Sequence, residues 1–81
     1  MDQINQVIEA LEEIAEDSET SKSVRECLNS AIEELKNGED RKVSIHKALN
    51  ILDDLSDNPS LESYSRGQIW SIVGLLESMS V

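Results

Sequence analysis

The chain has 81 residues and a formal charge of −10 at pH 7, with no Phe, one Trp and one Tyr. This length predicts one domain, residues 1–81, with a thin aliphatic core. The acidity excludes the basic footprint of direct nucleic-acid binding, and no apolar run approaches the roughly 18 residues of a membrane span. Cys27 is the only cysteine and the N-terminus is not basic, so we expect a cytoplasmic protein without a signal peptide.

The first two predicted helices cover residues 3–17 and 22–37. Their apolar residues recur at the three- and four-residue spacing of one helix face. These residues are Ile4, Val7, Ile8, Leu11, Ile14 and Ala15, then Val24, Cys27, Leu28, Ala31, Ile32 and Leu35. Ser23 and Glu26 predict a capping box at the start of the second helix. Asn37-Gly38 predicts its end, because glycine adopts the left-handed conformation of a helix C-terminus at low cost.

The third and fourth predicted helices cover residues 41–57 and 62–79. Asp40 predicts the N-cap of the third helix. Asn58-Pro59 predicts its end, because a residue before proline is disfavoured in the helical region. The inner faces consist of Ile45, Ala48, Leu49, Leu52 and Leu55, then Ile69, Ile72, Val73 and Leu76. No alternating strand pattern occurs, so the predicted fold class is all-α.

The two halves of the chain repeat each other, with a constant offset of 41 in residue number. The matched pairs are Ile4 and Ile45, Ile8 and Leu49, Leu11 and Leu52, Ile14 and Leu55, Arg25 and Arg66, Leu28 and Ile69, Ile32 and Val73, and Leu35 and Leu76. This period is the size of a HEAT-like helical hairpin. We therefore predict a four-helix antiparallel bundle of two tandem hairpins, residues 1–38 and 39–81. Two hairpins can form either a closed bundle or an open pair that a second chain completes.

Arg25 and Arg66 occupy equivalent positions early in the second helix of each hairpin. The positive end of the helix dipole does not favour a cation there, so we expect each arginine to bond carboxylates or carbonyl groups of its own loop, and we favour a structural ion pair. The candidate partners are Glu16 and Asp17 for Arg25, and Asp54 and Asp57 for Arg66. The alternative is a pair of anion-binding sites.

Residues 1–40 contain 12 acidic and 3 basic residues, giving −9, whereas residues 41–81 contain 5 and 4, giving −1. Neither a calcium-loop spacing nor a Glu-x-x-His motif accompanies the acidic residues. Their pattern favours a solvated helix face over a metal site: Glu9, Glu12, Glu13, Glu16, Asp17 and Glu19. Cys27 at a core position and the lone His46 are poor candidates for a nucleophilic pair. We expect no enzymatic activity, no catalytic residue, no metal and no cofactor.

The fourth helix carries no charge from Gly67 to Leu76. Small residues lie opposite its core face, with Trp70 and Leu75 between the two faces. Gly67 and Gly74 each lower helix stability by about 1 kcal/mol relative to alanine. Because this outer face is small and uncharged, it would let another backbone approach closely. The alternative for Gly74 is close packing within the fold. The candidate interface consists of Ser63, Gly67, Trp70, Ser71, Gly74, Leu75 and Ser78.

The second repeat carries a longer signature: Ile51-Leu52-Asp53-Asp54-Leu55-Ser56-Asp57-Asn58-Pro59, then Arg66, Ile69-Trp70, Val73-Gly74 and Leu76-Glu77. On these residues the chain resembles the small archaeal uncharacterised protein family 0147 over nearly its whole length. The resemblance implies an α-helical bundle from archaeal cytoplasm, without an assigned activity or functional residues. Residues 18–21 and 61–62 lack the prolines that members of this family often have, which implies looser loops.

The expected function is a helical protein–protein interaction module or adaptor that self-associates, as a possible homodimer, through the fourth helix. One alternative is a small metal-binding protein or enzyme. Another is an accessory factor of nucleic-acid machinery that binds a basic protein partner rather than the nucleic acid, because acidity favours basic partners by steering their encounter. Neither direct nucleic-acid binding nor membrane binding is expected.

Overall fold

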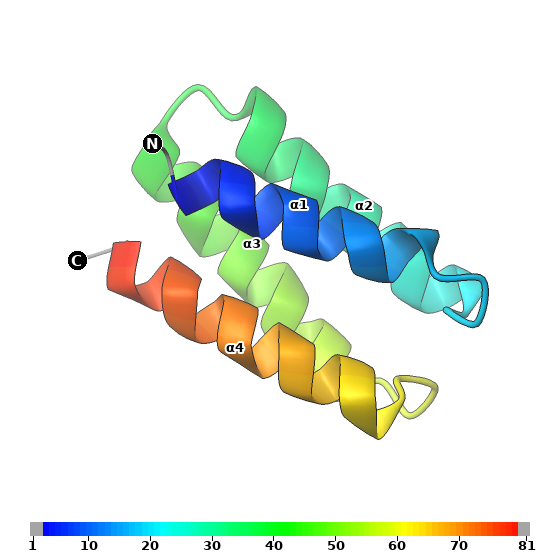
Figure 1. The fold of residues 1–81 in the computed structure, drawn as a ribbon. Helices are drawn as coiled ribbons and strands as arrows, with labels where there is room; N and C mark the ends of the chain where they lie inside the picture. The colour runs from blue at the N-terminus through cyan, green and yellow to red at the C-terminus, as the bar shows by residue number, and fades with distance from the viewer. Residues whose placement is uncertain (1–2, 80–81) are drawn as a thin grey trace.

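The computed structural model describes residues 3–79, which form four helices joined by short loops (Figure 1). The helices are α1 (Gln3–Glu16), α2 (Lys22–Asn37), α3 (Arg41–Ser56) and α4 (Ser63–Met79). Each bound agrees with its prediction to within one residue, and the all-α fold class is confirmed. Residues 1, 2, 80 and 81 of the predicted hairpins lie outside the described residues.

Each helix packs against two neighbours, which closes the four helices into a ring. Contacts join α1 to α2, α2 to α3, α3 to α4, and α1 to α4. Consecutive helices run antiparallel, so the α1–α2 and α3–α4 loops lie at one end of the bundle and the α2–α3 loop at the other (Figure 1). The α1–α4 contact distinguishes the two predicted arrangements: the chain forms a closed up-and-down bundle, not an open pair of hairpins.

The core consists of the aliphatic faces that the helical spacing predicted. Leu11, Leu28, Leu52, Ile69 and Leu76 have no solvent-exposed surface. Burying a side chain of this kind stabilises the fold by about 1.5–3 kcal/mol. Three positions differ from the prediction: Cys27 and Leu49 are only half-buried against the core, and Leu61, from the α3–α4 loop, is buried in it.

The structure contradicts the predicted N-terminal cap of α2 and confirms that of α3. Ser21 is the N-cap of α2, and its hydroxyl accepts a hydrogen bond from the Val24 N–H at 3.3 Å. The predicted capping box of Ser23 and Glu26 is wrong, because Ser23 already lies inside the first turn. Asp40 is confirmed as the N-cap of α3. Its carboxylate accepts bonds from the N–H groups of the second and third helical residues at 2.9 and 3.3 Å.

Gly38 follows the end of α2 as predicted, but for a different physical reason. Its φ of −66° and ψ of 134° are extended, so the left-handed conformation predicted there is wrong. A Cβ at this position would overlap the side chain of Ser44 and lie 2.8 Å from the Glu34 carbonyl oxygen. Ser44 is itself buried on α3. The α2–α3 loop therefore passes so close to α3 that a larger residue does not fit.

Candidate functional site

Arg25 extends back from the first turn of α2 and holds the α1–α2 loop. Its Nε donates to the carbonyl oxygen of Ala15 at 2.9 Å. Its Nη2 donates to the carbonyl oxygens of Asp17 and Thr20 at 3.2 and 3.1 Å. The last carbonyl groups of a helix have no partner within that helix. Arg25 therefore satisfies the C-terminal end of α1 and fixes the loop that follows.

Arg66 makes the same set of bonds in the second hairpin. Its Nε donates to the carbonyl oxygen of Ser56 at 3.1 Å, and its Nη2 donates to those of Asn58 and Leu61 at 3.4 and 3.3 Å. In the register of the repeat, each acceptor is the counterpart of one in the first hairpin. The repeat in the sequence is thus a repeat of individual hydrogen bonds.

These bonds correct the predicted ion pairs. Both arginines donate to backbone carbonyls of their own loops, which were the second kind of partner predicted, whereas the favoured ion pairs of Arg25 with Asp17 and Arg66 with Asp57 are wrong. The physical reason is the helix end, where carbonyls with partial negative charge are already fixed in place. A carboxylate would lose side-chain entropy on being held there. Because the loops occupy Nε and Nη2 of both guanidinium groups, the alternative of anion-binding sites is not supported.

The two loops share a second feature and touch each other. The Asp17 carboxylate accepts the Glu19 N–H at 2.9 Å, and the Asn58 side-chain oxygen accepts the Ser60 N–H at 2.9 Å. These local bonds are Asx turns, which stabilise tight connections. The hydroxyls of Ser21 and Ser60 lie 3.2 Å apart and join the two loops at one end of the bundle. The polar groups described at this end of the bundle therefore hold the loops in place.

The outer face of α4 carries the candidate interface. Six of its seven predicted residues are exposed: Ser63, Gly67, Trp70, Ser71, Gly74 and Ser78. Leu75 instead is half-buried and packs against the core. A Cβ at Gly67 or Gly74 would meet no atom within 4 Å. The alternative that Gly74 makes room for a neighbour within the fold is therefore wrong.

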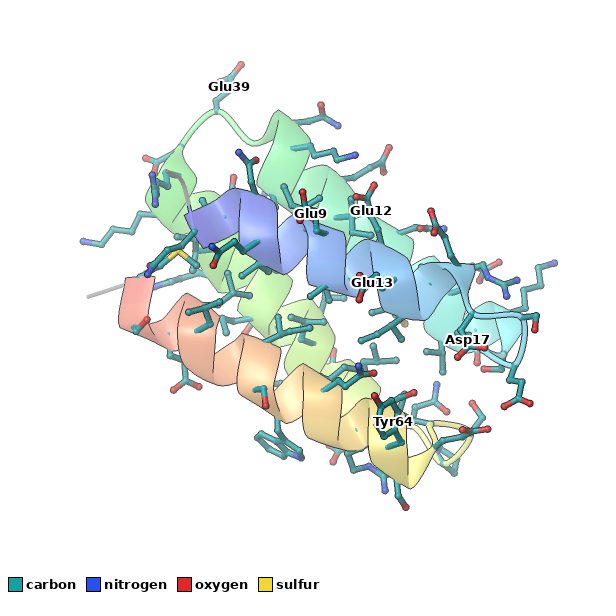
Figure 2. The ribbon with its side chains drawn as sticks, in the orientation of Figure 1. Glu9, Glu12, Glu13, Asp17, Glu39 and Tyr64 are labelled. Atoms are coloured by element: carbon teal, nitrogen blue, oxygen red, sulfur yellow. The ribbon has the colours of Figure 1, made fainter. Side chains whose placement is uncertain are left out.

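Two aromatic side chains lie on the surface of α4. Trp70 is 56% exposed and Tyr64, in the first turn, is 77% exposed. Figure 2 shows Tyr64 at the loop end of α4. Sequence reasoning missed Tyr64, although an aromatic residue outside the apolar face of a helix is itself a signal of exposure.

Sequence reasoning also missed two open hollows between α1 and α2. One, of about 570 Å³, lies over Ile8 and Leu35. The other, of about 590 Å³, lies over Ala15 and Ile32. The predicted acidic face thus borders a surface depression. An ion pair crosses between the hollows, from Lys36 Nζ to Glu12 Oε2 at 3.2 Å.

The weaker candidates for chemistry lie apart from these surfaces. Cys27 is half-buried against the core, and His46 is exposed on α3. Across residues 3–79, no three side chains of His, Cys, Asp or Glu are arranged so that they could hold a metal ion. None of the four described helices has the length and apolar character needed to cross a membrane.

Comparison with known proteins agrees with the predicted resemblance. A family described as Uncharacterised protein family (UPF0147) matches residues 1–79. The UPF0147 protein PF0239 of Pyrococcus furiosus is 32% identical over 80 residues, covering 96% of this chain and 86% of that protein. The UPF0147 protein MJ1419 of Methanocaldococcus jannaschii is 40% identical over 68 residues, covering 83% of this chain and 73% of that protein.

A solved structure confirms the fold. The crystal structure of the unknown function protein MMP1188 superposes with a TM-score of 0.90 and 35% sequence identity, covering 95% of this chain and 89% of that one. Fold, sequence and family signature therefore agree along nearly the whole chain. The chain belongs to the Uncharacterised protein family (UPF0147), which has archaeal members.

Proposed function

We propose that this protein is a helical interaction module that forms a homodimer through the outer face of α4, and that it is not an enzyme. Trp70 carries the proposal, because its side chain is 56% exposed on a helix face without charge from Gly67 to Leu76. Tryptophan is enriched among the residues that dominate binding energy at interfaces. A second copy of the chain would cover it.

The two glycines of α4 support close approach of a partner backbone. Gly67 and Gly74 lie about one helical turn before and after Trp70, and each faces open space. Each lowers helix stability by about 1 kcal/mol relative to alanine. Nothing in residues 3–79 uses the room that they leave. A partner helix packed against this face would use it.

The charge distribution favours a second copy as that partner. Residues 41–81 carry a net charge of −1, whereas residues 1–40 carry −9. Two copies that met through their first hairpins would repel strongly, and this repulsion is weakest when the second hairpins meet. A neutral contact face also avoids the desolvation of charged groups, which are depleted at interface cores.

Light scattering on matched variants tests the proposal. Ser71→Glu places a charge on the proposed contact, whereas Ser30→Glu places one at the equivalent position of the first hairpin. Both serines are exposed, and α2 and α4 do not contact each other. We expect a dimeric mass for the native chain and for Ser30→Glu, and a monomeric mass for Ser71→Glu. A monomeric native chain, or a dimer that survives Ser71→Glu and Gly74→Glu, would contradict the proposal.

A further inference from the structure

The least covered part of the core lies along one seam of the surface. Among the buried apolar residues of the described chain, five have the largest exposed fractions, 7–9%. All five line the hollows between α1 and α2: Ile4, Ile8, Ala15, Ile32 and Leu35. We call this seam the α1–α2 groove. Its floor is apolar in each hollow, and the Lys36–Glu12 ion pair lies between the two apolar parts.

Carboxylates border the groove on both sides. They come from α1, from α2 and from the α2–α3 loop: Glu9, Glu12, Glu16, Glu33 and Glu39. Figure 2 shows Glu9 and Glu12 on the side of α1 near α2, with Glu39 beyond them on the loop. The groove therefore combines an apolar floor with an acidic border.

Three cations also line the groove, and the structure gives each of them a partner. Arg25 donates to three carbonyl oxygens of its loop. Lys36 pairs with Glu12 at 3.2 Å across the groove, and both side chains remain about half exposed, at 50% and 41%. Arg41 Nη2 lies 4.0 Å from Met79 Sδ at the far end. Acidic groups outnumber basic ones on this border.

The acidic border belongs to the first hairpin only in part. In the register of the repeat, Glu9 corresponds to Asn50 and Glu33 corresponds to Gly74, whereas Glu12 and Glu16 correspond to Asp53 and Asp57 and stay acidic. The duplication therefore kept the core positions and the arginine bonds while the outer faces diverged in part. The acidic border also argues against a second copy as the occupant of the groove, because another chain of charge −10 would be repelled there.

We propose that the α1–α2 groove binds a basic amphipathic helix of another protein. Apolar side chains of that helix at positions i, i+4 and i+7 would lie on the floor, and its Lys and Arg side chains would pair with the bordering carboxylates. From Ile4 to Ala15 the two hollows together follow α1 for about 18 Å, which matches a partner helix of about 12 residues. The charge of −9 in residues 1–40 would speed its encounter.

A synthetic helix is the probe, with leucines on one face and lysines on the other. Its affinity is measured by calorimetry, and its location from amide chemical shifts. We expect Glu9→Gln/Glu33→Gln to weaken binding about tenfold, because the charges removed lie on the groove. The matched control, Glu13→Gln/Glu26→Gln, removes two exposed charges elsewhere on the same two helices and should change the affinity less than about twofold.

Two further measurements separate groove binding from diffuse charge attraction. Lys36→Gln removes the cation that crosses the groove and should tighten binding by about threefold, since Glu12 becomes available to the peptide. A peptide of equal charge with serine in place of leucine should bind at least about tenfold more weakly, because the apolar floor gains nothing from it. Absence of binding, equal losses from both double variants, or equal affinity for both peptides would overturn the proposal.

Discussion

At the level of single residues, one arginine organises each hairpin loop. The guanidinium group carries several N–H donors in a fixed plane, so it can satisfy several carbonyl groups at once. Arg25 and Arg66 use this property identically, each with three carbonyl oxygens at matching positions. The sequence placed both arginines correctly and left carboxylate and carbonyl partners open, but it favoured carboxylates, because carbonyl acceptors have no signature in a sequence.

Replacement of Arg66 by leucine should lower the free energy of unfolding by about 1–3 kcal/mol, because three partly buried carbonyl groups lose a charged donor. For a domain of this size, each 1 kcal/mol corresponds to a drop in Tm of about 4–8 °C. The loss should persist in 1 M salt, which screens exposed ion pairs. Lys47→Leu, at an exposed site of α3, is the control. Equal Tm values for Arg66→Leu and the native chain would contradict this role.

Replacement of glycine by alanine should lower the free energy of unfolding at Gly38 and raise it at Gly67 and Gly74. Gly38→Ala should destabilise the fold, since the new Cβ would collide with Ser44. Gly67→Ala and Gly74→Ala face open space and should each stabilise the monomer by up to about 1 kcal/mol. Urea denaturation in the Ser71→Glu background measures these values without any contribution from dimerisation. Stabilisation by Gly38→Ala would contradict the close contact with Ser44, and destabilisation by Gly67→Ala or Gly74→Ala would contradict the open space beside those glycines.

At the level of elements, the sequence specified the helix bounds well and one cap badly. Asp40, Gly38 and Pro59 interrupt the apolar periodicity clearly, so the ends near them were predictable. Ser21 and Ser23 both precede a helical pattern, and the capping-box rule favoured the wrong one. The first helical bond, from the Arg25 N–H to the Ser21 carbonyl at 2.9 Å, shows that α2 begins earlier. That choice depends on the loop held by Arg25.

Alanine substitution distinguishes the two serines. Ser21→Ala removes the acceptor of the Val24 N–H and should lower stability by about 1 kcal/mol, as loss of an N-cap does. Ser23→Ala lies inside the first turn and should change stability by less than about 0.5 kcal/mol. Thermal unfolding followed by circular dichroism measures both. A larger loss of stability for Ser23→Ala than for Ser21→Ala would support the capping box of Ser23 and Glu26 instead.

At the level of the whole molecule, closure of the bundle and the groove were beyond prediction. A repeat of this period fits an open or a closed pair of hairpins, and only the packing of α1 on α4 distinguishes them. The groove exists because hollows open between α1 and α2 above core residues that are only 7–9% exposed, which no helical pattern expresses. The acidic residues of α1 were therefore predicted to be a solvated face. The exposed face of α4 was predictable, because an uncharged outer face is visible in the sequence itself.

The fluorescence of Trp70 tests self-association most directly, because it is the only tryptophan of the chain and lies on the proposed contact. In a homodimer its indole leaves water, so the emission should be blue-shifted in concentrated solution and should move to longer wavelength on dilution. The midpoint of this change should coincide with the fall in mass measured by light scattering. Ser71→Glu should show the long-wavelength emission at every concentration. Emission of a solvent-exposed indole from the native chain at all concentrations would contradict dimerisation through α4.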